Sequence, residues 1–178
     1  MPSSPRDPLL RGLAAGDEES FGLLFDRFGS RLYGVALSML GSREDAEDAV
    51  QELFVGLVRW RSRLAEVDDL EGYLFVCLRH AVARRATRRG RQPQSWDPVQ
   101  LGELVADRRG APPAGDVERL ERALQGLPAA QREAIALKIE GSLTFAQIGR
   151  VLDISPNTAA SRYRYALGRL RAAMEERS

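Results

Sequence analysis

Apolar residues recur at intervals of three and four along most of this chain, which is the spacing of one face of an α-helix. The first run contains Phe21, Leu24, Phe25, Phe28, Leu32, Val35 and Met39. Asp17 before this run suits an N-cap, and Gly41 after it suits a C-terminal stop. No segment shows the alternation that is typical of a β-strand, so the pattern predicts an all-α protein.

Two further helices are predicted before residue 90. The segment Ser42-Arg43-Glu44-Asp45 resembles a capping box with Asp in the place of Glu or Gln, and it would begin the second helix. The apolar stripe of that helix contains Ala46, Val50, Leu53, Phe54, Leu57 and Val58. The apolar stripe of the third contains Leu74, Cys77, Leu78, Ala81 and Val82, so we expect Cys77 in the core.

The periodicity fades between about residues 89 and 116, where the chain has four prolines. We interpret 91–115 as a flexible linker, with a weak helical turn near 101–105, between helical domains at 10–90 and 116–178. The second domain begins an apolar stripe with Val117, Leu120, Leu124 and Leu127, which Ile135 and Ile139 continue. Pro128 is expected at the first position of a helix.

The last fifty residues have the pattern of a helix-turn-helix motif. Thr144-x-x-Gln147 is a capping box that begins a short helix, whose apolar face contains Phe145, Ile148, Val151 and Leu152. Asp153 and Ile154 form a tight corner, and Ser155 and Pro156 then suit the N-cap and first position of a longer helix. The inner stripe of the longer helix is Ala159, Tyr163, Ala166, Leu167, Leu170 and Met174.

Polar and basic residues face outward at the start of this longer helix: Asn157, Thr158, Ser161, Arg162 and Arg164. Small polar residues let the first turns of a recognition helix approach the major groove, and arginine then reaches guanine or phosphate. This pattern predicts DNA binding. The alternative is a helical hairpin with a solvated arginine face.

The formal net charge of +1 conceals an uneven distribution of charge. Residues 59–91 contain nine arginines and four acidic residues, and residues 79–91 contain six arginines and no acidic residue. A second basic segment is the tail at 155–178. These two segments are the candidate nucleic-acid contacts.

Several classes of protein are not expected. One cysteine and one histidine leave no internal disulfide and no zinc-ligand spacing. No apolar run reaches the ~20 residues of a membrane span, and residues 1–11 lack the pattern of a secretory signal, so the expected location is the cytoplasm. No nucleophile elbow, phosphate-binding glycine loop or metal triad is present, so neither enzymatic activity nor a cofactor is expected.

Two stretches together resemble the sigma-70 family. Residues 45–54, Asp-Ala-Glu-Asp-Ala-Val-Gln-Glu-Leu-Phe, are similar to its "D-A-E-D-x-x-Q-E-x-F" segment. The segments Leu127-Pro128-x-x-Gln131-Arg132-Glu133, Thr144-Phe145-x-x-Ile148 and Thr158-x-x-Ser161-Arg162 resemble its promoter-binding helix-turn-helix. Their order and spacing match the short extracytoplasmic-function (ECF) sigma factors.

The resemblance implies two functional surfaces in the first domain. Asp48, Gln51, Glu52 and Val55 would dock on a coiled coil of the polymerase β′ subunit, while a solvated acidic face is the alternative and is the preferred interpretation for Asp45. The third helix and the loop before it would bind and open the −10 element. The candidate residues there are Tyr73, Arg79, His80, Arg84, Arg85, Arg88 and Arg89, and a solvated basic helix end is the alternative.

This sequence departs from the family at some of these positions, because Tyr73 stands where Trp is common, His80 where Asn is common, and Arg84 near a usual Asp. The implied function is a dissociable sigma subunit that directs core RNA polymerase to −10 and −35 elements. Its partners would be polymerase, through the β′ coiled coil and β flap, and promoter DNA, with an anti-sigma factor as a further candidate. In the free protein we expect the two domains to pack together or tumble close to each other. A stand-alone helix-turn-helix regulator is the alternative function.

Overall fold

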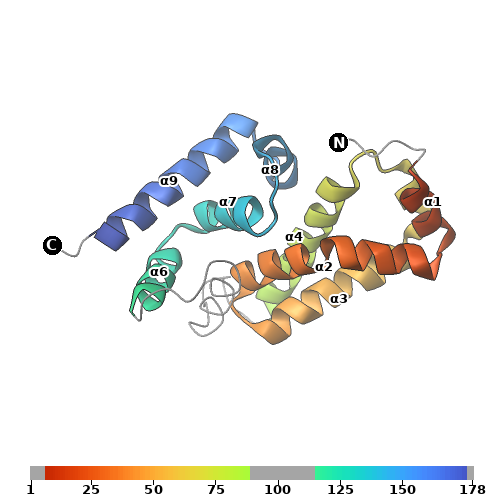
Figure 1. Ribbon diagram of the computed structural model, residues 1–178, viewed down its shortest axis with the longest axis horizontal. Helices are drawn as coiled ribbons and strands as arrows, with labels where there is room; N and C mark the ends of the chain where they lie inside the picture. The colour runs from red at the N-terminus through yellow and green to blue at the C-terminus, as the bar shows by residue number, and fades with distance from the viewer. Residues whose placement is uncertain (1–6, 89–114, 176–178) are drawn as a thin grey trace.

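The computed structural model describes residues 7–88 and 115–175, and these contain helices but no strand (Figure 1). The N-terminal half consists of α1 (Pro8–Ala15), α2 (Glu18–Leu40), α3 (Arg43–Arg59), the 3₁₀ helix η1 (Arg61–Glu66) and α4 (Leu70–Arg88). The C-terminal half consists of α6 (Asp116–Gln125), α7 (Ala129–Ile139), α8 (Phe145–Leu152) and α9 (Pro156–Glu175). The predicted linker at 91–115 lies outside the described residues except for residue 115. The predicted helical turn at 101–105 and the site residue Arg89 also lie outside them.

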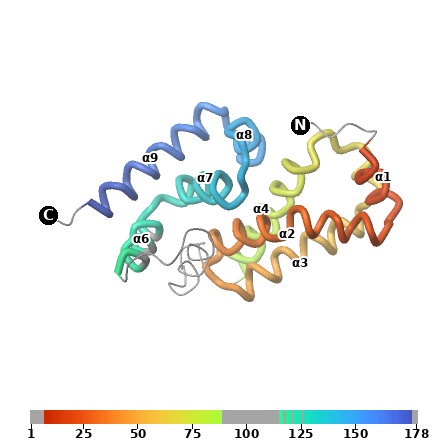
Figure 2. Tube along the Cα trace, viewed as in Figure 1, coloured from red at the N-terminus to blue at the C-terminus, as the bar shows by residue number. Residues whose placement is uncertain are grey.

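Helix α2 begins and ends, and helix α3 begins, where their capping residues predict. The Asp17 carboxylate accepts a hydrogen bond from the Ser20 amide at 2.9 Å, and Gly41 ends α2 with a left-handed φ of 64°. Ser42 caps α3 by accepting from the Asp45 amide at 3.3 Å. These caps place α2 and α3 side by side, with α4 crossing them (Figures 1 and 2).

The core of the N-terminal half is the apolar stripe predicted for these helices, with two corrections. Leu24, Phe28 and Leu32 of α2 are buried, but Phe25 is 55% exposed. Val58 of α3 is exposed as well. A 3.6-residue period marks a wide apolar band, and only the part of that band that faces a neighbouring helix is buried. Both side chains lie at the edge of the α2–α3 contact.

Helix α1 was not predicted. Asp7 caps it by accepting from the Leu9 amide at 2.9 Å, and Gly16 ends it with a left-handed φ of 82°. Its Leu10 and Leu13 are buried, and the helix packs on η1 and α2. The apolar residues of so short a helix span only two turns, which is too few for its period to be recognised.

In the C-terminal half, α8 and α9 form the predicted helix-turn-helix. Both bonds of the Thr144–Gln147 capping box are present, and Ser155 Oγ accepts from the Thr158 amide at 3.0 Å. At the corner, Asp153 has a left-handed φ of 55°. A Cβ on Gly149 would lie 2.7 Å from the Ile154 carbonyl oxygen, so the turn requires glycine there.

Two predictions for α7 are corrected. Pro128 is the N-cap of this helix rather than its first residue, because its extended ψ of 142° lets its carbonyl accept the amides of Gln131 and Arg132. Ile139 is exposed rather than buried, and it lines a small pocket together with Leu124 of α6 and Leu170 of α9. Arg132 is buried and donates to the carbonyls of Leu124 and Leu127, at 3.2 and 3.0 Å, which fixes α7 against the end of α6.

The two halves are in contact. Helix α7 packs on α2, and α8 packs on α4. Leu137, Leu143 and Ile148 belong to the same apolar core cluster as the buried residues of α2 and α4. This contact agrees with the expectation that the two domains lie together in the free protein.

Candidate functional site

A groove of about 1200 Å³ lies between α2 and α3. Its apolar lining comes from both helices and includes Phe21, Phe25, Tyr33, Phe54, Val55 and Val58. The ring centroids of Phe25 and Phe54 are 5.4 Å apart with the planes tilted by 58°. The sequence pattern did not distinguish the residues that line this groove from core residues. The signal that could have indicated the groove is an apolar band wider than one helix–helix contact requires.

The four predicted polymerase-binding residues divide between two adjacent faces of α3. Gln51 and Val55 are exposed and line the groove. Asp48 and Glu52 instead face α4, where Glu52 Oε1 is 2.8 Å from Arg84 Nε and Asp48 pairs with Arg85. Residues four apart lie in one column along a helix, so 48 with 52 and 51 with 55 form two neighbouring columns.

Asp45 corrects the expectation of a solvated acid. It is buried at the start of α3, and its Oδ1 lies 3.8 Å from Nη1 of Arg85. A buried carboxylate needs a compensating charge or hydrogen bonds. Arg85 therefore contacts both Asp45 and Asp48, which gives this arginine a structural role in the N-terminal half.

The other predicted −10 residues have different environments along α4. Arg79 Nε donates to Glu133 Oε1 of α7 at 2.8 Å, while His80 and Arg88 are exposed. Burial raises the pKa of the Tyr73 phenol. The structure thus places the predicted −10 residues from 73 to 88 on one helix, and it pairs Arg79, Arg84 and Arg85 with acidic side chains.

Cys77 lies one turn after Tyr73 and packs against the core, half-buried. Burial also raises the pKa of its thiol, although a hydrogen bond with Tyr73 acts in the opposite direction. A raised thiol pKa favours the unreactive protonated form. Cys77 therefore packs against the core, as the sequence indicated, but it is only partly buried.

The predicted recognition residues lie together on the first turns of α9. Asn157, Thr158 and Arg164 are exposed, while Ser161 and Arg162 are half-buried. Arg164 Nη2 donates to Ser161 Oγ at 3.2 Å. Tyr165 is the most exposed large apolar residue in the part of the chain that the structure describes, at 70%, and it was not among the predicted site residues. The tilted ring contact of Phe145 with Tyr163, with centroids 5.6 Å apart, joins the two helices of the motif.

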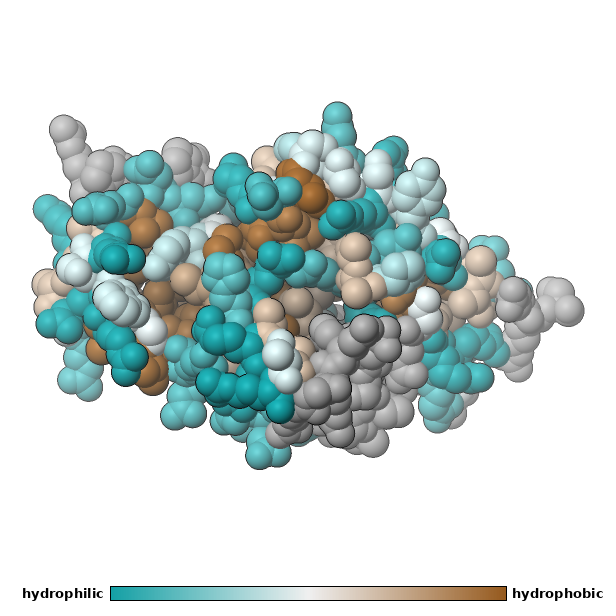
Figure 3. Space-filling view, turned by 180° about the vertical axis from the view of Figure 1, so that it is seen from behind, coloured by the Kyte–Doolittle hydropathy of each residue, from teal (hydrophilic) through white to brown (hydrophobic). Residues whose placement is uncertain are grey.

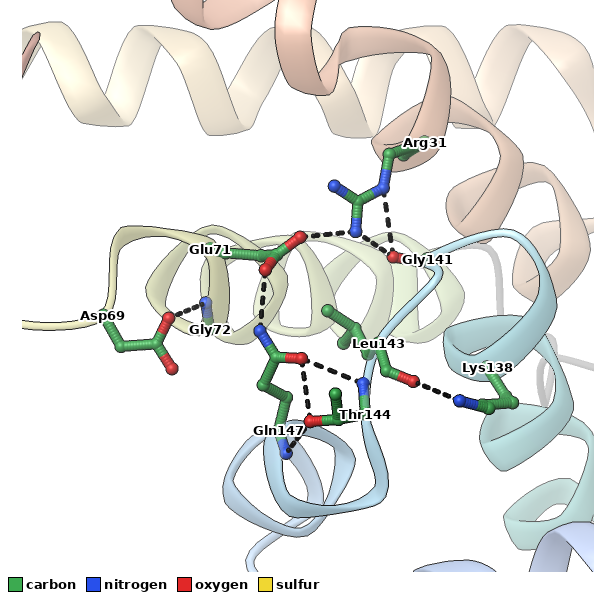
Figure 4. Close-up of polar contacts among 9 residues, drawn as sticks. All are labelled: Arg31, Asp69, Glu71, Gly72, Lys138, Gly141, Leu143, Thr144 and Gln147. Atoms are coloured by element: carbon green, nitrogen blue, oxygen red, sulfur yellow. Dashed lines mark hydrogen bonds and ion pairs between the residues drawn. The ribbon is translucent and has the colours of Figure 1, made fainter. Parts of the chain in front are cut away.

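A polar cluster joins the two halves at the α4–α8 contact (Figure 4). Glu71 lies 2.5 Å from Arg31 of α2 and accepts a hydrogen bond from Gln147 of α8 at 2.6 Å. Arg31 also donates to the carbonyl of Gly141. Beside this cluster, Arg150 donates to Asp69 at 2.6 Å. The end of the loop before α4, which is a predicted −10 segment, is therefore in contact with α8 through Asp69.

The face of the molecule that points away from the viewer in Figure 1 is largely polar. Apolar residues reach its surface at the centre and in the N-terminal half (Figure 3). No group of three or more potential metal ligands occurs among residues 7–88 and 115–175. Within the same ranges, no helix has both the length and the hydrophobicity of a bilayer span.

Comparison with known proteins agrees with this arrangement. Residues 24–92 match sigma-70 region 2, and residues 117–170 match sigma-70 region 4. The ECF RNA polymerase sigma factor SigK of Mycobacterium tuberculosis H37Rv is 31% identical over 97% of this chain and 95% of that protein. This chain belongs to the ECF sigma factors. The SigK of Mycobacterium ulcerans is 29% identical over the same shares of the two chains.

Solved structures share the fold of this sigma factor. CnrH in complex with the cytosolic domain of CnrY matches with a TM-score of 0.72 at 21% identity, covering 98% of this chain and 100% of that one. The sigma factor RpoE of Bartonella quintana, in complex with the anti-sigma factor NepR, matches with a TM-score of 0.65 at 21% identity, covering 90% and 99%. The sigma factor is all-α, and it is a transcription initiation factor that acts as a dissociable polymerase subunit. A stand-alone regulator is not favoured, because that function leaves region 2 unexplained.

Proposed function

We propose that this sigma factor docks on core RNA polymerase through the groove between α2 and α3, together with the acidic column of α3. The groove carries the proposal, because the exposed Val55 and Phe25 line it with the half-buried Phe54 and the hydrophilic Gln51. An apolar groove between two helices suits a partner helix with an apolar stripe. The β′ coiled coil is the partner that the family resemblance implies, and the β flap is the partner for the C-terminal domain.

Promoter DNA is the second proposed partner. Residues 10–90 form the polymerase- and −10-binding domain, 91–115 the linker, and 116–178 the −35-binding domain. The −10 residues are Tyr73, Arg79, His80, Arg84, Arg85, Arg88 and Arg89. The −35 residues are Asn157, Thr158, Ser161, Arg162 and Arg164. Their support is the grouping of basic and polar side chains on α4 and at the start of α9.

An anti-sigma factor is a third proposed partner, supported by the fold shared with CnrH, solved with CnrY, and with RpoE, solved with NepR. We further propose that the sigma factor acts in the cytoplasm and has neither enzymatic activity of its own nor a cofactor. These proposals follow from the family, whose members initiate transcription as part of polymerase.

The docking proposal is tested by Val55→Asp in the full chain, with binding to purified core polymerase measured by co-purification. Val55 is 55% exposed, so the fold tolerates a carboxylate there, while an apolar partner would have to bury it. Leu23→Asp is the matched control, because Leu23 is 56% exposed on α2 but lies outside the groove. We expect Val55→Asp to lose polymerase binding and Leu23→Asp to keep it. Equal binding by both variants would contradict the docking site.

The −35 assignment is tested by Arg162→Ala in the polymerase holoenzyme. Loss of a guanine or phosphate contact costs ~1–3 kcal/mol and relaxes base preference at that position. Arg169→Ala is the control, since Arg169 is an exposed arginine two turns further along the same helix. Binding is measured on promoter variants selected from randomised −35 sequences. An Arg162→Ala holoenzyme with the wild-type preference would refute the assignment.

A further inference from the structure

The two surfaces proposed for the N-terminal domain share their charged side chains. Glu52 and Asp48, on the polymerase side, pair with Arg84 and Arg85, on the DNA side. Resting on the proposed function, we propose that these carboxylates occupy the arginines in place of DNA phosphate while sigma is free. Polymerase docking on α3 then takes up the carboxylates and releases the arginines for DNA.

The chemistry of the pairs suits such an exchange. A carboxylate and a phosphate both accept hydrogen bonds from a guanidinium in the same forked geometry, so one can replace the other on Arg84 or Arg85. Arg84 is 51% exposed and Glu52 29%, and exposed ion pairs contribute little net stability. The exchange therefore has a small cost, and solvent and DNA can reach the arginine without unfolding of the domain.

The two arginines are not equivalent. Among residues 7–88 and 115–175, Arg84 pairs with Glu52 on the surface of the domain. Arg85 is more buried, and it also lies near the buried carboxylate of Asp45. Release of Arg85 would leave Asp45 without that neighbouring positive charge. Arg84 is therefore the arginine that gains most availability to DNA when its carboxylate partner is taken up. Arg85 stays close to Asp45 and offers DNA only part of its guanidinium.

The geometry of α3 links this release to docking. Glu52 lies one residue after Gln51 and three before Val55, both of which line the groove. A polymerase helix seated in the groove would pass within reach of the neighbouring acidic column. Basic side chains on that helix would compete with Arg84 and Arg85 for Glu52 and Asp48.

The test removes the carboxylates without polymerase. Asp48→Asn with Glu52→Gln keeps the shapes of both side chains but abolishes their charge. Binding of the full chain to fluorescein-labelled, mixed-sequence single-stranded DNA is measured over a series of salt concentrations. We expect several-fold tighter binding and a plot of log K against log salt that is steeper by ~0.7 to 1.4, since each phosphate contact on a single strand adds about 0.7.

Removal of two negative charges strengthens binding to DNA phosphates through the overall charge alone, so a matched control is needed. Glu19→Gln with Asp26→Asn removes two charges from exposed positions of α2. It should produce a smaller gain and leave the salt slope unchanged. Most of the gain of the Asp48/Glu52 variant should disappear when Arg84→Ala is added, and the remainder is the share of Arg85. A gain no larger than that of the control, or one that Arg84→Ala leaves undiminished, would overturn the proposal.

This result is distinct from the fate of the docking site. If Val55→Asp keeps polymerase binding while the Asp48/Glu52 variant gains DNA binding, the docking site is wrong and the ion-pair competition stands. If Val55→Asp abolishes polymerase binding and the DNA gain is absent, docking stands and the competition is wrong.

Discussion

Gln147 Nε2 donates a hydrogen bond to Glu71 Oε2 across 2.6 Å, while Oε1 of the same Gln147 side chain accepts from the Thr144 amide at 2.9 Å. One amide group thus completes the N-cap of α8 and joins α8 to α4. The two functions use different atoms of the side chain. A substitution can therefore remove one and keep the other.

Gln147→Glu should separate the two halves of the protein without unfolding α8. Glutamate still accepts from the Thr144 amide, because Glu and Gln serve equally in a capping box. It loses the NH₂ donor and brings a second carboxylate to Glu71. We expect unchanged helical content by circular dichroism and a larger radius of gyration by small-angle X-ray scattering.

The double variant Gln147→Glu with Glu71→Gln controls for this effect, because it exchanges donor and acceptor and removes the repulsion. It should return the radius of gyration toward that of the wild type. A Gln147→Glu protein as compact as the wild type would show that this contact does not hold the halves together.

Gly149→Ala should disrupt the helix-turn-helix. The added Cβ would lie 2.7 Å from the backbone oxygen of Ile154, which can move only with the turn itself. We expect a loss of about 2 kcal/mol in the free energy of unfolding, as for other overpacked sites, and weaker binding of the holoenzyme to −35 DNA. Gly168→Ala in α9 is the control, since its Cβ would meet no atom within 4 Å. That variant should be neutral or slightly more stable.

Arg132→Met should destabilise the contact between α6 and α7. Methionine keeps much of the apolar stem but leaves the carbonyls of Leu124 and Leu127 without the guanidinium donor. Loss of a charged donor to buried acceptors costs about 3 kcal/mol. Urea unfolding should show a lower midpoint, whereas Arg122→Met, on the exposed side of α6, should change the midpoint little. Equal midpoints for the two variants would contradict a structural role for Arg132.

Asp17 should make the stability of the N-terminal half depend on pH in acid. The Ser20 hydroxyl and amide donate to its carboxylate and lower its pKa below the ordinary 3.8. A carboxyl whose pKa is lowered by folding stabilises the folded state above its ordinary pKa, and this contribution is lost as the pH falls through the folded value. Urea midpoints of wild type and Asp17→Asn should therefore converge below pH ~3.8. Ser20→Ala should narrow the difference, and a constant difference at every pH would refute the assignment.

Local signals in the sequence predicted the helix boundaries well. The caps at Asp17, Ser42, Thr144 and Ser155 are all confirmed, because a cap depends on residues within one turn of each other. Burial at the edges of a helix was predicted less well, as for Phe25, since it depends on which neighbour covers that side.

The ion pairs between α3 and α4 could not be predicted from the sequence. Arg84 and Glu52 are 32 residues apart on different helices, and no spacing rule joins them. The sequence therefore assigned them to two independent surfaces. The site residues themselves remain predictions, and the experiments above decide among them.

Any coupling between polymerase and DNA that the Arg84–Glu52 pair carries must act in both directions. If polymerase raises the affinity of sigma for DNA by some factor, thermodynamic linkage requires DNA to raise the affinity of sigma for polymerase by the same factor. The holoenzyme on a promoter would then retain sigma more tightly than the holoenzyme in solution. Once the polymerase moves off the promoter, the same ion pairs would re-form and favour dissociation of sigma.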